Sequence, residues 1–295
     1  TDGRVRHVAV IMGSPASGRS LLGLLSPLFQ SGESFEVQGV FLEDADVGHA
    51  AGLPFVKEVC RLTFSVREFT SDQFERSLAL SVRTARRTFS VLAARTGLPH
   101  SFRNVRGTGD RVLGEAAAGA DITVFEPAQL RLSALVRSVP GRHPQRRIVA
   151  LLNDPRNARE VLGTALQLAG GDSREVTVLL APEDGGHTAG LRDVVQEILP
   201  RKPAALRYLK GEPFAALCEA SRELGATLAV LSARHALGRP GSLQVLRAGM
   251  ACPVTWRQAS STSRTVYPVP VPRLKAPLAP PSTSRSNAAI CASAR

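Results

Sequence analysis

An internal repeat constrains the fold of this chain more than any other feature of its sequence. Residues 7–15 match residues 147–155 at an offset of 140 positions, and residues 106–116 match residues 210–220 at an offset of 104. Self-similarity at a fixed offset is the signature of two copies of one structural unit. We therefore expect a tandem duplication whose second copy is about 36 residues shorter in its middle, the difference between the two offsets.

Each copy alternates short apolar stretches with amphipathic ones, which is the pattern of strands followed by helices. Parallel strands need crossover connections, and helices supply them. The sequence therefore predicts an α/β protein made of two tandem, doubly wound, Rossmann-like domains with parallel sheets. In the first copy we expect strands at 7–12, 35–42, 101–105 and 121–125, and helices at 16–30, 73–96 and 109–118. In the second copy we expect strands at 147–152, 175–180, 205–209, 227–231 and 252–256, and helices at 156–169, 189–199 and 213–223.

These elements divide the chain into a first domain at 1–140, a second, shorter domain at 141–257 and a tail at 258–295. The first domain lacks a counterpart of the strand at 252–256, so one edge of its sheet is expected to need a partner. The two domains are therefore expected to pack as a pseudo-two-fold pair, or the chain to self-associate through sheet edges. The tail has five basic residues, no acidic residue and six of the chain's 20 prolines, a composition that predicts disorder.

The helix expected at 73–96 has clear signals at both of its ends. Apolar residues recur along it at helical spacing, Asp72 and Glu75 fit a capping box, and Gly97 follows its last turn. Four arginines lie on its outer face, which we interpret as a solvated surface rather than a ligand site: Arg76, Arg83, Arg86 and Arg87.

The net charge of +12 at neutral pH raises the question of nucleic-acid binding, since clustered Lys and Arg neutralise phosphates. Five of the basic residues lie in the tail, and the others are spread along the chain. No RRM, KH or zinc-finger pattern accompanies them. Nucleic acid is therefore not an expected partner, whereas an acidic protein bound by the basic tail is an alternative.

The sequence predicts neither a membrane segment nor a metal site. Residues 20–32 form a long uncharged stretch, but a membrane-spanning helix needs roughly 18–20 apolar residues. The apolar run at 8–12 is too short for a signal peptide. The six histidines include no pair at metal-ligand spacing, and the cysteines form no CxxC pair, so a cytoplasmic protein is expected. The four cysteines are Cys60, Cys218, Cys252 and Cys291, of which Cys218 and Cys252 are expected to be buried.

A turn rich in glycine and serine follows the first expected strand and precedes the first expected helix. It reads GSPASGRS over residues 13–20 and fits the pattern G-x-x-x-x-G-[K/R]-[ST] of a loop that wraps phosphates with backbone N–H groups. Arg19 replaces the usual Lys, and the second copy has no such turn. One interpretation is a helix N-terminus capped by Ser14 or Ser17. The other is a P-loop-like nucleotide site formed by Gly13, Ser14, Gly18, Arg19 and Ser20.

Several short motifs recur in a fixed order along both copies. They include the G-S-P and D-P turns after the first strands, Phe-Leu-Glu-Asp at 41–44, the R-G and K-G pairs, and Ala-Cys-Pro-Val at 251–254. Their order and spacing resemble the universal stress protein family over residues 5–257. The resemblance implies an adenine-nucleotide alpha-hydrolase-like fold with a parallel sheet in the order 3-2-1-4-5, usually dimerised or in tandem.

The resemblance also implies where a nucleotide would bind, and this chain departs from that pattern. ATP-binding members have an Asp that closes the first strand and a G-x2-G-x9-G-[ST] loop after the fourth. Met12 and Leu152 stand at the Asp position, and Glu126 in the first loop would repel phosphate. Four residues of the second copy are left for a weak nucleotide or anion site: Ser232, Arg234, Gly241 and Ser242.

These observations predict a non-enzymatic stress-response or regulatory protein of the bacterial cytosol with degenerate nucleotide sites. We expect no catalytic residue and no cofactor, and at most weak ATP binding in the second domain. Two alternatives stay open. The chain could be an ATP-binding universal stress protein with slow hydrolysis or none, or an interaction module whose basic tail contacts an acidic partner.

Overall fold

The computed structural model describes most of the chain up to residue 258. The described residues are 5–53, 55–59, 63–68, 70–107, 113–115, 119–127, 146–181, 188–199, 201, 203–234 and 242–258. Residues Thr1–Ser260 make up one compact unit. Apart from Gln258, the predicted tail at 258–295 lies outside the described residues.

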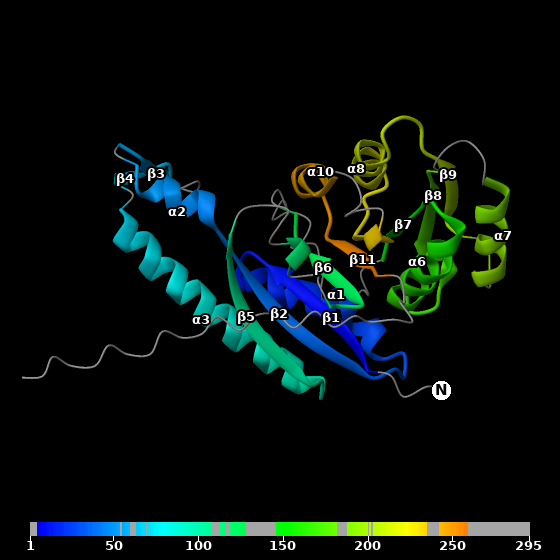
Figure 1. Ribbon diagram of the computed structural model, residues 1–295, viewed down its shortest axis with the longest axis horizontal. Coiled ribbons are helices and arrows are strands. Elements are labelled where there is room, and N and C mark those ends of the chain that lie inside the picture. Colours follow the sequence, from blue (N-terminus) through cyan, green and yellow to red (C-terminus); the bar gives the residue numbers. More distant parts are fainter. Residues whose placement is uncertain are drawn as a thin grey trace, which may run out of the picture. The chain divides into compact units, whose positions relative to one another are not determined.

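A nine-stranded sheet runs through the compact unit in the order β5-β2-β1-β6-β11-β10-β7-β8-β9 (Figure 1). The first half of the chain provides β1 (Arg6–Met12), β2 (Phe35–Asp44), β5 (His100–Gly107) and β6 (Ile122–Phe125). The second half provides β7 (Ile148–Leu152), β8 (Val176–Leu180), β9 (Ala205–Tyr208), β10 (Leu228–Ser232) and β11 (Val254–Arg257). Strands that pair within one half are parallel. The Rossmann-like α/β class and the order 3-2-1-4-5 of the second half are as predicted.

The two halves join where β6 pairs with β11 in antiparallel register. Phe125 lies opposite Val254, and Ile122 lies opposite Arg257. The place beside β6 that a fifth strand of the first half would take is therefore filled by the fifth strand of the second. The rings of Phe125 and Trp256 pack at this joint with centroids 4.9 Å apart, and Trp256 is 1% exposed. Because the two strands run in opposite directions, the carboxyl edge of each half lies beside the amino edge of the other.

Helices cover both faces of the sheet because side chains of a strand point alternately to either face. The face with Val8 and Val10 of β1 packs against α1 (Pro15–Phe29), α3 (Ser71–Arg95), α6 (Pro155–Leu168) and α7 (Thr188–Ile198). The face with Ile11 packs against α8 (Pro213–Glu223) and α10 (Ser242–Gly249). Of the helix predicted at 109–118, the structure describes only 113–115, which are helical, and α10 was not predicted. The domain boundaries at 140 and 257 stay predictions.

The turns after the first strands are helix caps. Ser14 caps α1 by accepting a hydrogen bond from the backbone N–H of Ser17 at 3.3 Å, and Pro15 follows it. Asp154 caps α6 by accepting from the N–H of Arg156 at 2.9 Å, and Pro155 follows it. Proline is favoured at this position because the first helical N–H has no partner within the helix. The G-S-P and D-P motifs are therefore explained by helix initiation.

The start of α3 differs from the prediction. Its cap is Thr70, whose hydroxyl accepts from the N–H of Gln73 at 3.4 Å, so the capping box of Asp72 and Glu75 was wrong. Asp72 instead lies in the first turn, where a carboxylate is favourable to the helix dipole. Gly97 follows the helix with φ of +69°, as a helix-terminating glycine does. The four arginines of the outer face are exposed, and Arg86 lies over the ring of Phe102.

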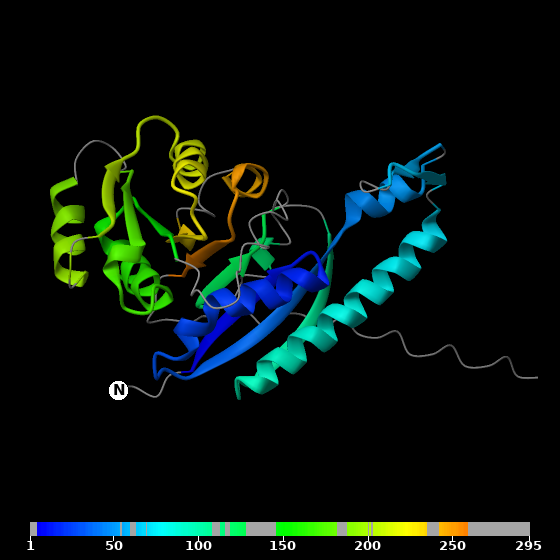
Figure 2. The same ribbon diagram turned by 180° about the vertical axis from the view of Figure 1, so that it is seen from behind.

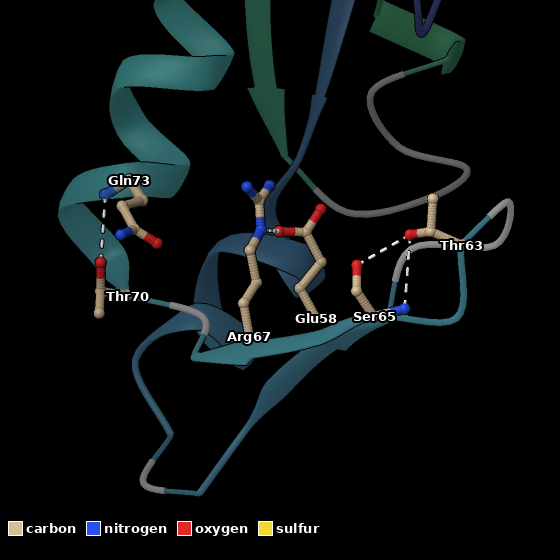
Figure 3. A network of polar contacts seen from close by, with 6 residues as sticks. All are labelled: Glu58, Thr63, Ser65, Arg67, Thr70 and Gln73. Carbon is tan, nitrogen blue, oxygen red and sulfur yellow. Dashed lines mark hydrogen bonds and ion pairs between the residues drawn. The ribbon is translucent and has the colours of Figure 1, made fainter.

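The first half carries an inserted segment between β2 and α3 that the sequence did not predict as helix or strand. It consists of α2 (Ala45–Ala51) and a hairpin of β3 (Lys57–Val59) and β4 (Val66–Glu68). Both views show it at the N-terminal end of α3 (Figures 1 and 2). Figure 3 shows the Arg67 guanidinium donating to Glu58, a bond that lowers the pKa of this carboxyl. Phe55 and Phe64 are 96% and 78% exposed.

Candidate functional site

Ligands of open, parallel α/β sheets bind outside the carboxyl ends of the strands, where the strand order reverses. In each half this place lies between the first and fourth strands. The first half has it at the ends of β1 and β6, and the second half has it at the ends of β7 and β10. The predicted site residues end or follow two of these strands, β1 in the first half and β10 in the second.

The turn after β1 has the sequence of a phosphate loop, and packing or helix capping accounts for several of its residues. A Cβ added at Gly18 would lie 3.0 Å from the Met12 sulfur, so this glycine is explained by packing beneath β1. The Ser20 hydroxyl is 3.5 Å from the carbonyl of Ala16 in its own helix. Among the other residues of this predicted site, Gly13 and Arg19 are exposed and Ser14 is the cap of α1.

A carboxylate of the chain itself lies at the N-terminus of α1. The Ser17 hydroxyl donates to the carboxylate of Glu126, which directly follows β6. The hydroxyl oxygens of Ser14 and Ser17 are 2.6 Å apart, so both serines belong to one hydrogen-bonded group. Burial raises the pKa of Glu126 above its ordinary value. The position where a P-loop would hold phosphate is therefore next to an acid, and sequence reasoning missed the role of Ser17 in holding it.

The ends of the first strands are apolar in both halves. Met12 and Leu152 are each 1% exposed and belong to the core beneath α1 and α6. The two side chains occupy equivalent positions, 140 residues apart in the sequence. Neither half therefore has a polar side chain at the last residue of its first strand that could bind a ligand.

The second predicted site is only partly described. Ser232 ends β10 and is 2% exposed, whereas Arg234 is exposed two residues later. Gly241 lies outside the described residues, and of Ser242 the structure describes only its backbone at the start of α10. The joint site of these four residues stays a prediction. Sequence reasoning also missed Arg257, a buried arginine that is the Cα partner of Ser232 in the neighbouring strand.

The two described cysteines are core residues, as predicted. Burial raises the pKa of the Cys218 thiol to about 11 and that of the Cys252 thiol to about 12. Thiols of such high pKa are neutral and weakly nucleophilic at neutral pH. Within the described residues, no three His, Cys, Asp or Glu side chains gather in a group that could hold a metal ion. The same part of the chain contains no helix with the length and hydropathy needed to cross a membrane.

Comparisons with known proteins give matches among solved structures alone. No protein-family model matches the chain, and no curated protein matches it. A universal stress protein from Archaeoglobus fulgidus matches with a TM-score of 0.46 and 13% identity, over 85% of this chain and 98% of that chain. A functionally unknown protein from Pseudomonas aeruginosa matches with a TM-score of 0.41 and 10% identity, over 87% and 94%. The fold assignment of this chain rests on its own strand order.

Proposed function

We propose that this chain is a non-enzymatic stress-response or regulatory protein of the universal stress protein type, with a first nucleotide site that its own carboxylate closes. The observation that carries the proposal is the hydrogen bond from Ser17 to Glu126 at the N-terminus of α1. The order of the sequence motifs and the strand order of the sheet support the universal stress protein type. The type itself is inferred from this resemblance.

The closed first site argues against nucleotide chemistry in that half. A phosphate at the N-terminus of α1 would meet the charge of Glu126 and would have to displace a hydrogen-bonded carboxylate. Each lost polar contact in a buried site costs about 1–3 kcal/mol, so two or three losses weaken a micromolar site to the millimolar range. Met12 in place of the family's Asp is one such loss, and Glu126 is another.

A protein of this type would act through contacts with other proteins rather than by turning over a substrate. The exposed rings of Phe55 and Phe64 in the inserted segment are apolar groups of the kind found at protein-binding surfaces. The alternative is an ATP-binding universal stress protein with slow hydrolysis. It requires that nucleotide affinity reside in the second half.

Isothermal titration calorimetry of the full chain with ATP and magnesium tests this function. We expect a dissociation constant weaker than about 1 mM for the unmodified chain. Glu126→Gln keeps the shape of the side chain and removes its charge, so we expect it to raise ATP affinity about tenfold or more. Glu219→Gln, an exposed acid in α8, is the matched control and should change nothing. A dissociation constant below about 10 µM for the unmodified chain would overturn the proposal in favour of the ATP-binding alternative.

A further inference from the structure

The two halves provide an internal comparison at the end of their fourth strands. The strands at 122–125 and 228–231 are equivalent, so Glu126 of the first half corresponds to Ser232 of the second. The offset of 140 likewise makes Ser17 of α1 equivalent to Asn157 of α6. The first half therefore places a carboxylate at this position, and the second half has a buried hydroxyl there and no acid.

A buried cation lies beside that hydroxyl. Arg257 ends β11, is the Cα partner of Ser232, and is 5% exposed. Its Nε and Nη1 atoms have no hydrogen-bond partner, and within the described residues no carboxylate forms an ion pair with it. A buried charge without a partner costs several kcal/mol, which makes such a group rare in folded proteins.

Two hydroxyls near Arg257 also lack partners. The oxygens Oγ of Ser232 and Oγ1 of Thr255 are buried, and neither forms a hydrogen bond with the part of the chain that the structure describes. Alternation along β11 turns Thr255 and Arg257 to the face that α6 covers, because Val254 and Trp256 belong to the opposite core. Register places Ser232 on the same face. Three neighbouring side chains of one face thus hold four buried polar atoms without partners.

The carboxylates near Arg257 form no ion pair with it in the described part of the chain. Burial lowers the pKa of Arg257, and the cation Arg6 lowers it further, by more than any single carboxylate raises it. The carboxylates that act on it are Glu160, Asp121 and Glu33. Glu33 is bound to Arg6 at 2.7 Å, and Asp121 accepts from the backbone N–H of His7 at 2.9 Å.

We propose that Arg257, together with the hydroxyls of Ser232 and Thr255, binds a small oxyanion, a phosphate or carboxylate group, at the carboxyl edge of the second half. The guanidinium supplies charge and N–H donors, and the hydroxyls supply two further donors. The bound group would lie at the end of the fourth strand of the second half, as Glu126 lies at the end of the fourth strand of the first. It would lie against β10 and β11 rather than on the N-terminal amides of α6, because Asp154 caps that helix. The site does not depend on the closed state of the first half.

The test measures thermal unfolding and calorimetric binding of the full chain with inorganic phosphate, against chloride at equal ionic strength. We expect phosphate to raise the unfolding temperature of the unmodified chain, and Arg257→Met to lose at least about tenfold in phosphate affinity. Ser232→Ala and Thr255→Val should each weaken binding by about three- to tenfold. Arg234→Gln removes an exposed arginine next to the same strand and should leave binding unchanged. Any general stabilisation by phosphate is common to all variants and cancels in the comparison.

Stability without phosphate separates a binding arginine from a structural one. If the role of Arg257 is to bind a ligand, Arg257→Met removes an unpaired charge and leaves the chain equally stable or more stable in chloride. A variant that is less stable in chloride, with an unchanged response to phosphate, would overturn the proposal, as would an unmodified chain that does not respond. If Arg257→Met fails to fold, Thr255→Val decides by the same two readouts. Titrations with acetate and ATP then identify the source of the oxyanion. If ATP binds more tightly than inorganic phosphate and acetate, the ligand is a nucleotide phosphate; if acetate binds most tightly, it is a carboxylate. If inorganic phosphate binds most tightly, the ligand is the free ion.

Discussion

The two halves of this sheet share a strand order and differ at the end of the fourth strand. In the first half, Glu126 is held by Ser17 at a helix N-terminus. In the second, the equivalent residue is Ser232, and Arg257 beside it has donors without acceptors. The two fourth strands, β6 and β10, are buried on both faces, so they tolerate little change. The residues at the ends of these strands differ between the halves: a carboxylate held by Ser17 follows β6, and a buried hydroxyl beside Arg257 ends β10.

The halves also depend on each other unequally, because β11 belongs to the second half and completes both. The Trp256 side chain is 1% exposed at the joint, so replacing it by Ala leaves a cavity there. We expect this change to lower the free energy of unfolding by about 3–5 kcal/mol. Urea unfolding followed by circular dichroism measures this loss. Tryptophan fluorescence cannot be used, because Trp256 is the only tryptophan and the variant lacks it. Tyr208→Ala, at an exposed position on β9, is the control. A loss below about 1 kcal/mol would mean that the joint contributes little to either half.

A second difference lies in the packing of the second strands. Gly39 of β2 faces Phe102 and Phe89, and an added Cβ would lie 2.8 and 3.0 Å from their rings. At the corresponding register position of β8 stands Val178. Gly39→Ala should therefore destabilise the first half by about 1–3 kcal/mol, measured by urea unfolding. Adding Phe102→Leu should restore part of the loss, and an unchanged midpoint for the single variant would contradict the close packing.

Two equivalent glycines should respond alike, because their surroundings are alike. Gly23 of α1 and Gly163 of α6 lie inside helices, and a Cβ would meet nothing within 4 Å at either. Each change to Ala should stabilise the chain by about 0.5–1 kcal/mol, the gain in helix propensity. Thermal unfolding of both single variants measures it. Effects of opposite sign in the two halves would break the equivalence of α1 and α6.

The closed site should give the first half a pH dependence that the second lacks. Burial raises the pKa of Glu126 in the folded chain, so the folded state binds more protons than the unfolded state between the two pKa values. The contribution of this group to stability is therefore full below its ordinary value near 4.5 and falls as pH rises through the folded value. Glu126→Gln should reduce this decrease in unfolding temperature with rising pH, and should leave the unfolding temperature at acidic pH unchanged. Identical pH profiles of the two proteins would contradict it.

The smallest effect is expected from the tail. A chain ending at Ser260 keeps β11 and the bond from the Gln258 N–H to the Asp121 carbonyl, so its unfolding temperature should change by less than about 2 °C. A chain ending at Pro253 lacks β11 and should lose its cooperative unfolding. A drop of more than about 5 °C for the first truncation would show that the composition of the tail misleads about its role.

Much of the fold was predictable because its signals are local. Strands are short apolar runs, and α6 and α8 each begin at a proline and carry a periodic apolar face, so α6, α8 and β8 lie within a residue or two of their predicted bounds. The order of the strands came from the resemblance of the motifs to the universal stress protein family, and the order in the second half agrees with it. The inserted segment escaped prediction because its elements are short and its large apolar residues, such as Phe55, are exposed.

The sites were less predictable because they depend on contacts between distant residues. Glu126 was recognised as an obstacle to phosphate, but its bond to Ser17 spans 109 positions and has no sequence signature. Arg257 was read as the last residue before the tail. Only the pairing of β11 with β6 and β10 shows that it is buried and lacks an acceptor.

The shared joint has a consequence for synthesis of the chain. Phe125 of β6 pairs with Val254 of β11, about 130 residues further along. At about 5–20 residues per second, a ribosome needs roughly 6 to 26 s to make the connecting chain. During that time the edge of β6 is apolar and unpaired, and such an edge can bind chaperones or other nascent chains. The sheet of the first half is therefore complete only when β11, the last strand of the second half, has been synthesised.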